Sequence, residues 1–210
     1  YLPPRRYMLV GAGLAGGAAF AWVQRTISQW LRTFGVERSD SEIYAVLARE
    51  LESTPTPLNG LECIPYFHGT RQWPAARGEF RGISTDNFTP AHVSAAVLDA
   101  IAGRMRDFYM LAAAADASGP HSWPAQRIIA SGIAVRLNPL LVQRIANAIQ
   151  LPIDVPVHRE EAAYGAALLA GVAAGVWPSL ADAVGCIQHI RVAIPQSTGD
   201  LRDSSQQSGI

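Results

Sequence analysis

Short apolar segments that run through a turn into a helix-like stretch recur along this chain. Residues 7–10 lead through a glycine- and alanine-rich turn into a helical pattern at 15–34. The same succession recurs twice further on, with strands predicted at 127–130 and 153–157 and helices at 139–149 and 160–175. Strands that alternate with helices in this way are typical of α/β proteins. We therefore predict an α/β fold in which helices outnumber strands.

Local start and stop signals place most of the other elements. Ser39-x-x-Glu42 is a capping box and predicts a helix at 41–52. Thr89-Pro90 combines an N-cap residue with a first-turn proline and predicts a long helix that ends near residue 111. The remaining predictions are a strand at 61–67, a glycine- and arginine-rich loop at 68–88, a surface excursion at 112–126 and a short helix at 178–187.

Length and composition limit the class of protein. A chain of 210 residues can bury one real core, and its composition turns polar after about residue 194. We predict one domain at 1–194 and a disordered tail at 195–210. The formal net charge of +0 argues against a nucleic-acid partner, and no apolar run approaches the ~20 residues of a membrane helix. We expect a soluble, cytoplasmic protein without a membrane partner.

The types of reactive side chain exclude several chemistries. All 17 basic residues are arginine, so no Walker A lysine and no Schiff-base lysine is possible in this segment. Cys63 and Cys186 lie far apart without CxxC spacing, and we interpret both as buried thiols in a reducing compartment. His68 and His92 lack a second ligand at helical spacing, so no metal site is predicted.

Residues 11–16 read GAGLAG, which is a literal GxGxxG motif between a predicted strand and a predicted helix. A dinucleotide site also requires a second strand that ends in an acidic residue about 20 positions further on. Here a polar turn at 35–40 follows the helix and leads to another helix. We therefore do not predict a nicotinamide or flavin dinucleotide site.

Four segments, in order, resemble the C-terminal domain of the FGGY family of carbohydrate kinases. They are AGGAAFAW at 15–22, PYFHGTR at 65–71 with ARGEFRG at 76–82, IASGIAVRLNP at 129–139, and EEAAYGAA at 160–167. The third segment is a longer loop than in xylulose or glycerol kinases and looks most like the sedoheptulokinase branch. The resemblance implies one lobe of a ribonuclease H-like, actin-like ATPase fold. It also implies an ATP-dependent sugar kinase that uses Mg²⁺.

The resemblance assigns a nucleotide-binding role to four residues. Ser131 and Gly132 would meet the adenosine end of ATP, Asn138 would hydrogen-bond the adenine, and Gly17 would lie near the phosphates. Glycine permits close backbone approach, and backbone N–H groups at a helix start can face a phosphate without any lysine. Glycerol kinases place a nucleotide-contacting glutamine where this chain has Ala21.

Structural roles for the same residues stay open. Asn138-Pro139 is also an ordinary N-cap with a first-turn proline. Glu160 and Glu161 would be favoured in a first helical turn by the helix dipole alone. The arginines of the 68–88 loop could bind phosphate or could be solvated beside Glu79 and Asp86.

No catalytic residue is predicted in this segment. The resemblance places the catalytic aspartate and most of the magnesium and sugar contacts in an N-terminal domain upstream, and Asp86 matches no catalytic position. Two functions are expected on this basis. In the first, the segment binds ATP and closes on its N-terminal domain and a small sugar. In the second, it is a non-catalytic remnant that serves only as a folding or interaction domain. Whether the chain forms a homodimer stays open.

Overall fold

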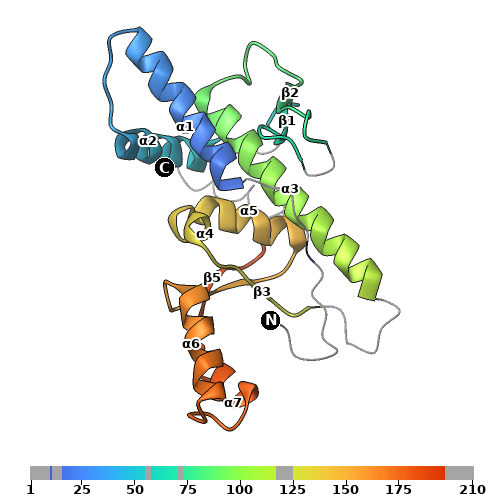
Figure 1. Cartoon of the computed structure of the whole chain (residues 1–210). Helices are drawn as coiled ribbons and strands as arrows, with labels where there is room; N and C mark the ends of the chain where they lie inside the picture. Colours follow the sequence, from blue (N-terminus) through green and yellow to red (C-terminus); the bar gives the residue numbers. More distant parts are fainter. Residues whose placement is uncertain (1–9, 11–15, 55–57, 71–72, 117–124, 197–210) are drawn as a thin grey trace, which may run out of the picture. The chain divides into compact units, whose positions relative to one another are not determined.

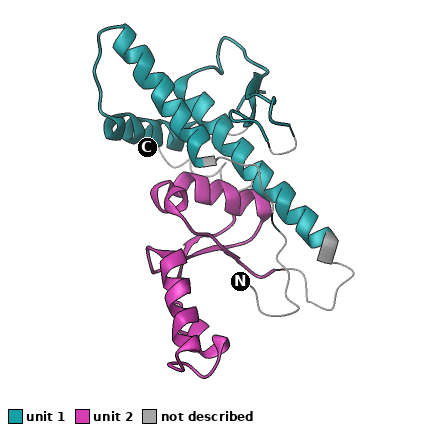
Figure 2. Cartoon of the chain, in the orientation of Figure 1, with its two compact units in different colours: residues 1–121 teal, residues 122–210 magenta. Residues whose placement is uncertain are grey.

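The computed structural model describes residue 10 and residues 16–54, 58–70, 73–116 and 125–196. The chain divides into two compact units, Tyr1–His121 and Ser122–Ile210 (Figure 2). The strand predicted at 7–10 lies almost entirely outside the described residues, as do the first five positions of GAGLAG and the tail from 197 onward. One domain over 1–194 stays a prediction.

The described residues of unit 1 form three helices and a pair of short antiparallel strands (Figure 1). The helices are α1 (Gly16–Thr33), α2 (Asp40–Ser53) and α3 (Pro90–Asp116), and the strands are β1 (Glu62–Ile64) and β2 (Glu79–Arg81). All three helices pack against one another, and β1 packs against α3. The core centres on α3, where Val97, Leu98 and Ile101 are fully buried. Burial of such side chains is the dominant favourable term in folding.

The predicted signals set the helix starts of unit 1. The Ser39 hydroxyl accepts a hydrogen bond from the Glu42 backbone N–H, and the Glu42 carboxylate accepts one from the Ser39 backbone N–H, which completes the predicted capping box. Thr89 Oγ1 accepts a hydrogen bond from the His92 backbone N–H, and α3 begins at Pro90 as predicted. In the described part of the chain, α1 leads through residues 34–39 into α2 without an intervening strand, so the βαβ unit of a dinucleotide site does not form there.

The loop predicted at 68–88 contains a strand, β2, that was not predicted. β2 pairs antiparallel with β1, with Cys63 opposite Phe80. Asn87 lies fully buried at the base of this region. Its Oδ1 accepts a hydrogen bond from the Ser84 N–H at 2.8 Å, and its Nδ2 donates to the carbonyls of Asn59 and Gly82, each at 2.9 Å. Asn87 therefore fastens the end of the loop to the turn that precedes β1.

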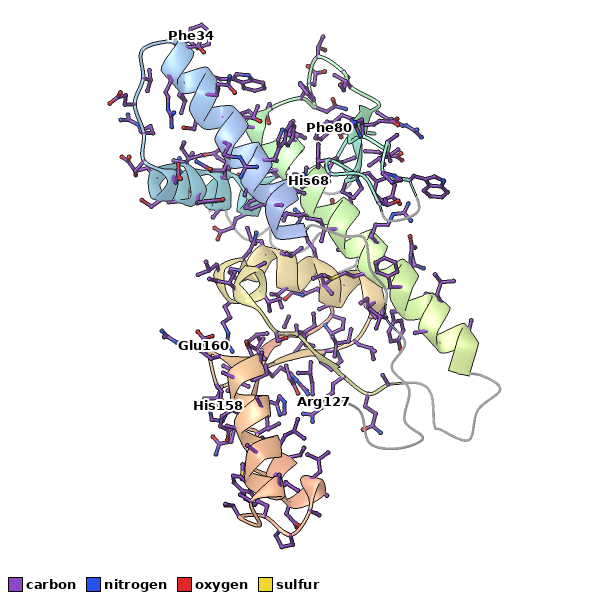
Figure 3. The ribbon with its side chains drawn as sticks, in the orientation of Figure 1. Phe34, His68, Phe80, Arg127, His158 and Glu160 are labelled. Carbon is purple, nitrogen blue, oxygen red and sulfur yellow. The ribbon has the colours of Figure 1, made fainter. Side chains whose placement is uncertain are left out.

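An open apolar groove of about 190 Å³ runs along α1 in unit 1. Trp22, Ile27 and Trp30 of α1 line it, together with Phe80 and Phe88. Phe34, just after the end of α1, is 83% exposed (Figure 3). Unit 1 therefore presents aromatic surface to solvent along α1.

Unit 2 is built on a three-stranded sheet of order β3-β4-β5. The strands are β3 (Ile128–Ile129), β4 (Ile153–Pro156) and β5 (His189–Ala193), and the helices are α4 (Ile133–Leu137), α5 (Pro139–Ile149), α6 (Glu161–Ala173) and α7 (Leu180–Val184). β3 and β4 run parallel, and β5 runs antiparallel to β4. The helices predicted at 139–149 and 160–175 are confirmed, whereas α4 and β5 were not predicted. Leu141, Ile145 and Ile153 belong to the core of this unit.

The two cysteines do not behave alike. Cys63 is half-buried in β1, and burial raises the pKa of its thiol to about 12. Cys186 is exposed on the turn after α7, so the prediction of a buried thiol is wrong there. That turn follows the C-cap Gly185 and carries its side chains on the surface.

Asp154 of the central strand β4 holds two arginines. Its side chain is only 5% exposed and accepts hydrogen bonds from Arg127 Nη1 at 2.9 Å and from Arg191 Nε at 2.8 Å. These contacts, with Arg191 the larger influence, hold the pKa of the Asp154 carboxyl below its usual value of 3.8 against the opposing effect of burial. The folded state therefore favours the ionised carboxylate.

We expect Asp154→Asn to lower the free energy of unfolding at pH 7 by about 2 kcal/mol, because neutral amide hydrogen bonds to arginine are weaker than those of a carboxylate. A carboxyl whose pKa falls on folding stabilises the protein above its unfolded pKa, and the contribution is lost as pH falls through the folded pKa. The gap between the wild type and the variant should therefore be full at pH 7 and close progressively below pH 3.8. Urea titrations between pH 7 and pH 2.5 measure it. A gap that is constant over this range would contradict the prediction.

Candidate nucleotide-binding site

The parallel pair β3 and β4 brings two of the predicted segments to one edge of the sheet. The Ala130 N–H donates to the Asp154 carbonyl at 2.9 Å, which extends the pairing to the end of β3. Ser131 and Gly132 follow β3, and residues 157–160 follow β4. In α/β sheets, ligands bind outside the carboxyl ends of parallel strands. The third and fourth segments therefore meet where such a fold places its ligand.

Gly132 gives the loop after β3 its shape. Its backbone lies at φ +99° and ψ 164°, a conformation that L side chains rarely adopt, and it is the N-cap residue of α4. A Cβ atom at Gly132 would meet no atom within 4 Å, so the backbone conformation and not crowding requires glycine. Ser131 and Gly132 are both exposed and thus accessible to a ligand.

Asn138 caps α5 as its structural interpretation predicts. Its Oδ1 accepts a hydrogen bond from the Leu141 N–H at 2.9 Å, and Pro139 occupies the first position of the helix. The capping bond uses the carbonyl oxygen of the side-chain amide and leaves the Nδ2 donor out of it. Capping and ligand binding are therefore compatible at this residue.

Arg136 joins the third segment to the fourth. Its guanidinium donates to the Glu161 carboxylate from Nη2 at 2.5 Å and from Nε at 3.2 Å, and Nη2 also donates to the carbonyls of Pro156 and His158 at 2.8 and 2.6 Å. The hydrogen bonds of Arg136, and more weakly those of the Glu161 and Gly132 backbones, lower the pKa of the Glu161 carboxyl. The helix dipole, which by itself favours Glu161 in a first turn, does not predict this contact. No local signal links these residues, since they lie 25 positions apart.

The start of α6 also holds a stacked ring pair. The rings of His158 and Tyr164 lie 3.7 Å apart between centroids and 16° from parallel. Glu160, the N-cap residue of α6, makes no side-chain capping bond and is exposed. Figure 3 labels His158 and Glu160 at the end of α6 that adjoins the sheet.

The first two segments meet in unit 1. Gly17 is exposed in the first turn of α1, and Trp22 of the same helix stacks on Phe67 with 4.4 Å between ring centroids. Phe67 also contacts Phe80 of β2, at 6.4 Å between centroids. This aromatic contact joins AGGAAFAW to the PYFHGTR and ARGEFRG segments. The structure thus places Ser131, Gly132 and Asn138 in unit 2 and Gly17 in unit 1.

The arginines of the 68–88 loop bond locally. Arg81 pairs with Glu79 at 2.9 Å, and Arg77 donates to the carbonyls of Pro74 and Ala76. Arg71 lies outside the described residues. The solvated-loop interpretation therefore accounts for the two described arginines.

No group of three or more His, Cys, Asp or Glu side chains among the described residues could hold a metal ion. No magnesium ligand is assigned in the described ranges. Likewise, none of the helices that the structure describes is long and apolar enough to span a membrane.

A match to one protein-family model shows which family the chain is related to. The model described as "FGGY family of carbohydrate kinases, C-terminal domain" matches residues 2–174. The chain belongs to the FGGY family of carbohydrate kinases. The resemblance to this family was inferred from four short segments in order, and the match confirms it over most of the chain.

Curated relatives of this FGGY domain include glycerol kinases. The glycerol kinase of Deinococcus radiodurans is 33% identical over 202 residues, which cover 94% of this chain and 36% of the relative. That of Trichlorobacter lovleyi is 35% identical over 175 residues, covering 81% of this chain and 31% of the relative. The FGGY domain described here thus spans about a third of the length of these relatives. A sedoheptulokinase branch stays a prediction.

Solved structures of a xylulose kinase and a glycerol kinase share this fold. The xylulose kinase of Rhodospirillum rubrum superposes with a TM-score of 0.66 at 24% identity, over 86% of this chain and 33% of that one. The Plasmodium falciparum glycerol kinase with ADP gives 0.62 at 18% identity, over 93% of this chain and 36% of that one. The predicted actin-like, ribonuclease H-like fold is confirmed.

Proposed function

We propose that this chain is the nucleotide-binding domain of an ATP-dependent carbohydrate kinase that transfers the γ-phosphoryl group of ATP to a sugar hydroxyl. The observation that carries the proposal is the meeting of the third and fourth family segments at the carboxyl edge of β3 and β4, fastened by Arg136 and Glu161. There Ser131 and Gly132 are exposed and Asn138 retains a donor. Family membership supports the reaction class.

The proposed work of this domain is to hold and orient ATP. In unit 2, the exposed backbone of Ser131 and Gly132 would contact the adenosine end, and Asn138 Nδ2 would donate to the adenine. In unit 1, the family resemblance assigns Gly17, in the first turn of α1, a place near the phosphates. Holding ATP in a fixed orientation lowers the entropic part of the barrier to transfer. The catalytic base, the Mg²⁺ ligands and most sugar contacts are assigned to an N-terminal domain of the same protein.

Other parts of the proposal concern the whole protein. Its sugar belongs to the small polyols and sugars that FGGY kinases phosphorylate, and a seven-carbon ketose is the specific candidate from the form of the 129–139 loop. A cytoplasmic location fits an enzyme that consumes ATP. In the alternative function, as a remnant that only folds or interacts, the chain would bind nucleotide weakly or not at all.

We expect the chain to bind ADP and Asn138→Ser to weaken that binding about 5- to 10-fold, the effect of one lost hydrogen bond of about 1 kcal/mol. Serine keeps an oxygen that can accept from the Leu141 N–H, so α5 stays capped at a cost of a few tenths of a kcal/mol. Isothermal titration with ADP measures the affinity, and thermal unfolding without ligand checks the cap.

Asn147→Ser in the same unit provides the control, because Asn147 lies at the other end of α5. Equal ADP affinity in Asn138→Ser and the wild type would limit Asn138 to capping. A wild-type chain that binds no ADP would favour the remnant over the nucleotide-binding domain.

A further inference from the structure

We propose that Glu161 is a positioning residue that, through Arg136, holds the Ser131–Gly132 loop and α4 in the conformation that receives the nucleotide. The inference rests on the proposed function for its consequence in binding. The positioning itself rests on contacts within unit 2.

Apart from the contacts of Arg136, few contacts fix the conformation of the residues between β3 and α5. α4 is five residues long, buries none of them and has no side-chain cap at Gly132. Ile133 and Leu137 on this helix are each 76% exposed. A segment without buried apolar contacts opens at low free-energy cost unless polar contacts hold it.

Arg136 forms such polar contacts with three other residues. It bonds the Glu161 carboxylate through two nitrogens and the carbonyls of Pro156 and His158 through Nη2. Pro156 ends β4, every residue of which is buried. A planar guanidinium with several donors in a fixed geometry suits this role better than lysine does. Arg136 thereby ties α4 to the sheet and to the start of α6.

Glu161 is the residue that binds Arg136 through its side chain. The side chains of Arg136 and Glu161 are each only 23% exposed, so water screens the pair less than it would an exposed pair. The Glu161 carboxylate accepts from both Nε and Nη2 of Arg136, at 3.2 and 2.5 Å. This carboxylate therefore holds the arginine of the helix that follows the loop glycine.

The neighbouring carboxylate supplies a matched control. Glu160 has the same side chain and lies one residue earlier, but it is exposed and makes no capping bond. Both glutamates are subject to the same helix dipole. Any difference between variants at the two positions therefore reports the Arg136 contact.

The test compares Glu161→Ala with Glu160→Ala in the 210-residue chain, by ADP titration calorimetry at 10 °C and by amide hydrogen exchange of residues 130–138 without ligand. If a substitution leaves the loop in its binding conformation in only one molecule in ten, the apparent Kd for ADP rises about 10-fold. We expect that rise in Glu161→Ala and Arg136→Ala, with faster exchange of the loop. Glu160→Ala should stay within 2-fold of the wild type in both measurements.

The readouts separate the possible failures. A folded Glu161→Ala variant with wild-type ADP affinity and wild-type loop exchange overturns the inference, as does an equal loss in Glu160→Ala. Lower thermal stability with unchanged ADP affinity at 10 °C would show a structural role only and also overturns it. If Glu161→Ala does not fold, Glu161→Gln keeps one oxygen acceptor for Arg136 and must show a smaller change of the same kind. A wild-type chain without ADP affinity refutes the proposed function, and loop exchange still decides the positioning.

Discussion

Replacing Gly82 by alanine should destabilise unit 1 by about 3 kcal/mol or more. Gly82 ends the ARGEFRG segment at φ +69°, where an alanine costs about 1–2 kcal/mol in backbone conformation alone. Its Cβ would also lie 2.1 Å from the carbonyl oxygen of Gly60, and backbone cannot swing aside as a flexible side chain can. The urea midpoint of the chain, followed by tryptophan fluorescence, measures the loss.

Gly35→Ala separates the two contributions. Gly35 lies at φ +73° in the same unit, and a Cβ there meets no atom within 4 Å. That variant should lose only the conformational part, about 1–2 kcal/mol. Equal losses at the two positions would mean that the turn at Gly60 moves freely and that the close approach carries no cost.

Asn87→Ala should cost about 3 kcal/mol. The substitution removes three hydrogen bonds from a fully buried side chain and leaves the Ser84 N–H and the carbonyls of Asn59 and Gly82 without that partner. Each buried polar group that loses its partner costs about 1–3 kcal/mol, reduced where water enters the space left by the side chain. Equilibrium unfolding in urea gives the free-energy difference.

The adjacent Asp86→Ala is the control for that loss. Asp86 is exposed, so its replacement should change the free energy of unfolding by less than about 0.5 kcal/mol. A neutral Asn87→Ala would show that β2 and the loop after it are held by the aromatic contacts of Phe67 and Phe80 instead.

The sequence predicted helix starts well because their signals are local. The capping box at Ser39 and Glu42, the Thr89-Pro90 pair and the Asn138-Pro139 pair each lie within four residues of the backbone group that they satisfy. β2 and β5 were missed because a strand of three to five residues is defined by its partner. Glu79 pairs with Ile64, and Arg191 pairs with Asp154 from 37 positions away. Pairing over such distances has no local signature.

The family segments identified the residues of the candidate site, but they did not identify the contacts that hold these residues in place. Ser131, Gly132 and Asn138 could be identified from their order in the chain. The contact between Arg136 and Glu161 could not, because it depends on β3 and β4 lying side by side and parallel. At position 132 the sequence predicted only that glycine permits close approach of the backbone. The structure shows that the positive φ angle at this position requires glycine.

The arginine pair on Asp154 also selects how three strands assemble. Side chains alternate between the faces of a strand, so a slip of β5 by one residue would carry Arg191 to the opposite face. Asp154 would then be buried with one cation in place of two, a heavy penalty for a desolvated carboxylate. Misaligned sheets are thereby disfavoured once Asp154 is buried. The same ionic contacts that stabilise the finished sheet act, during folding, as a check on its alignment.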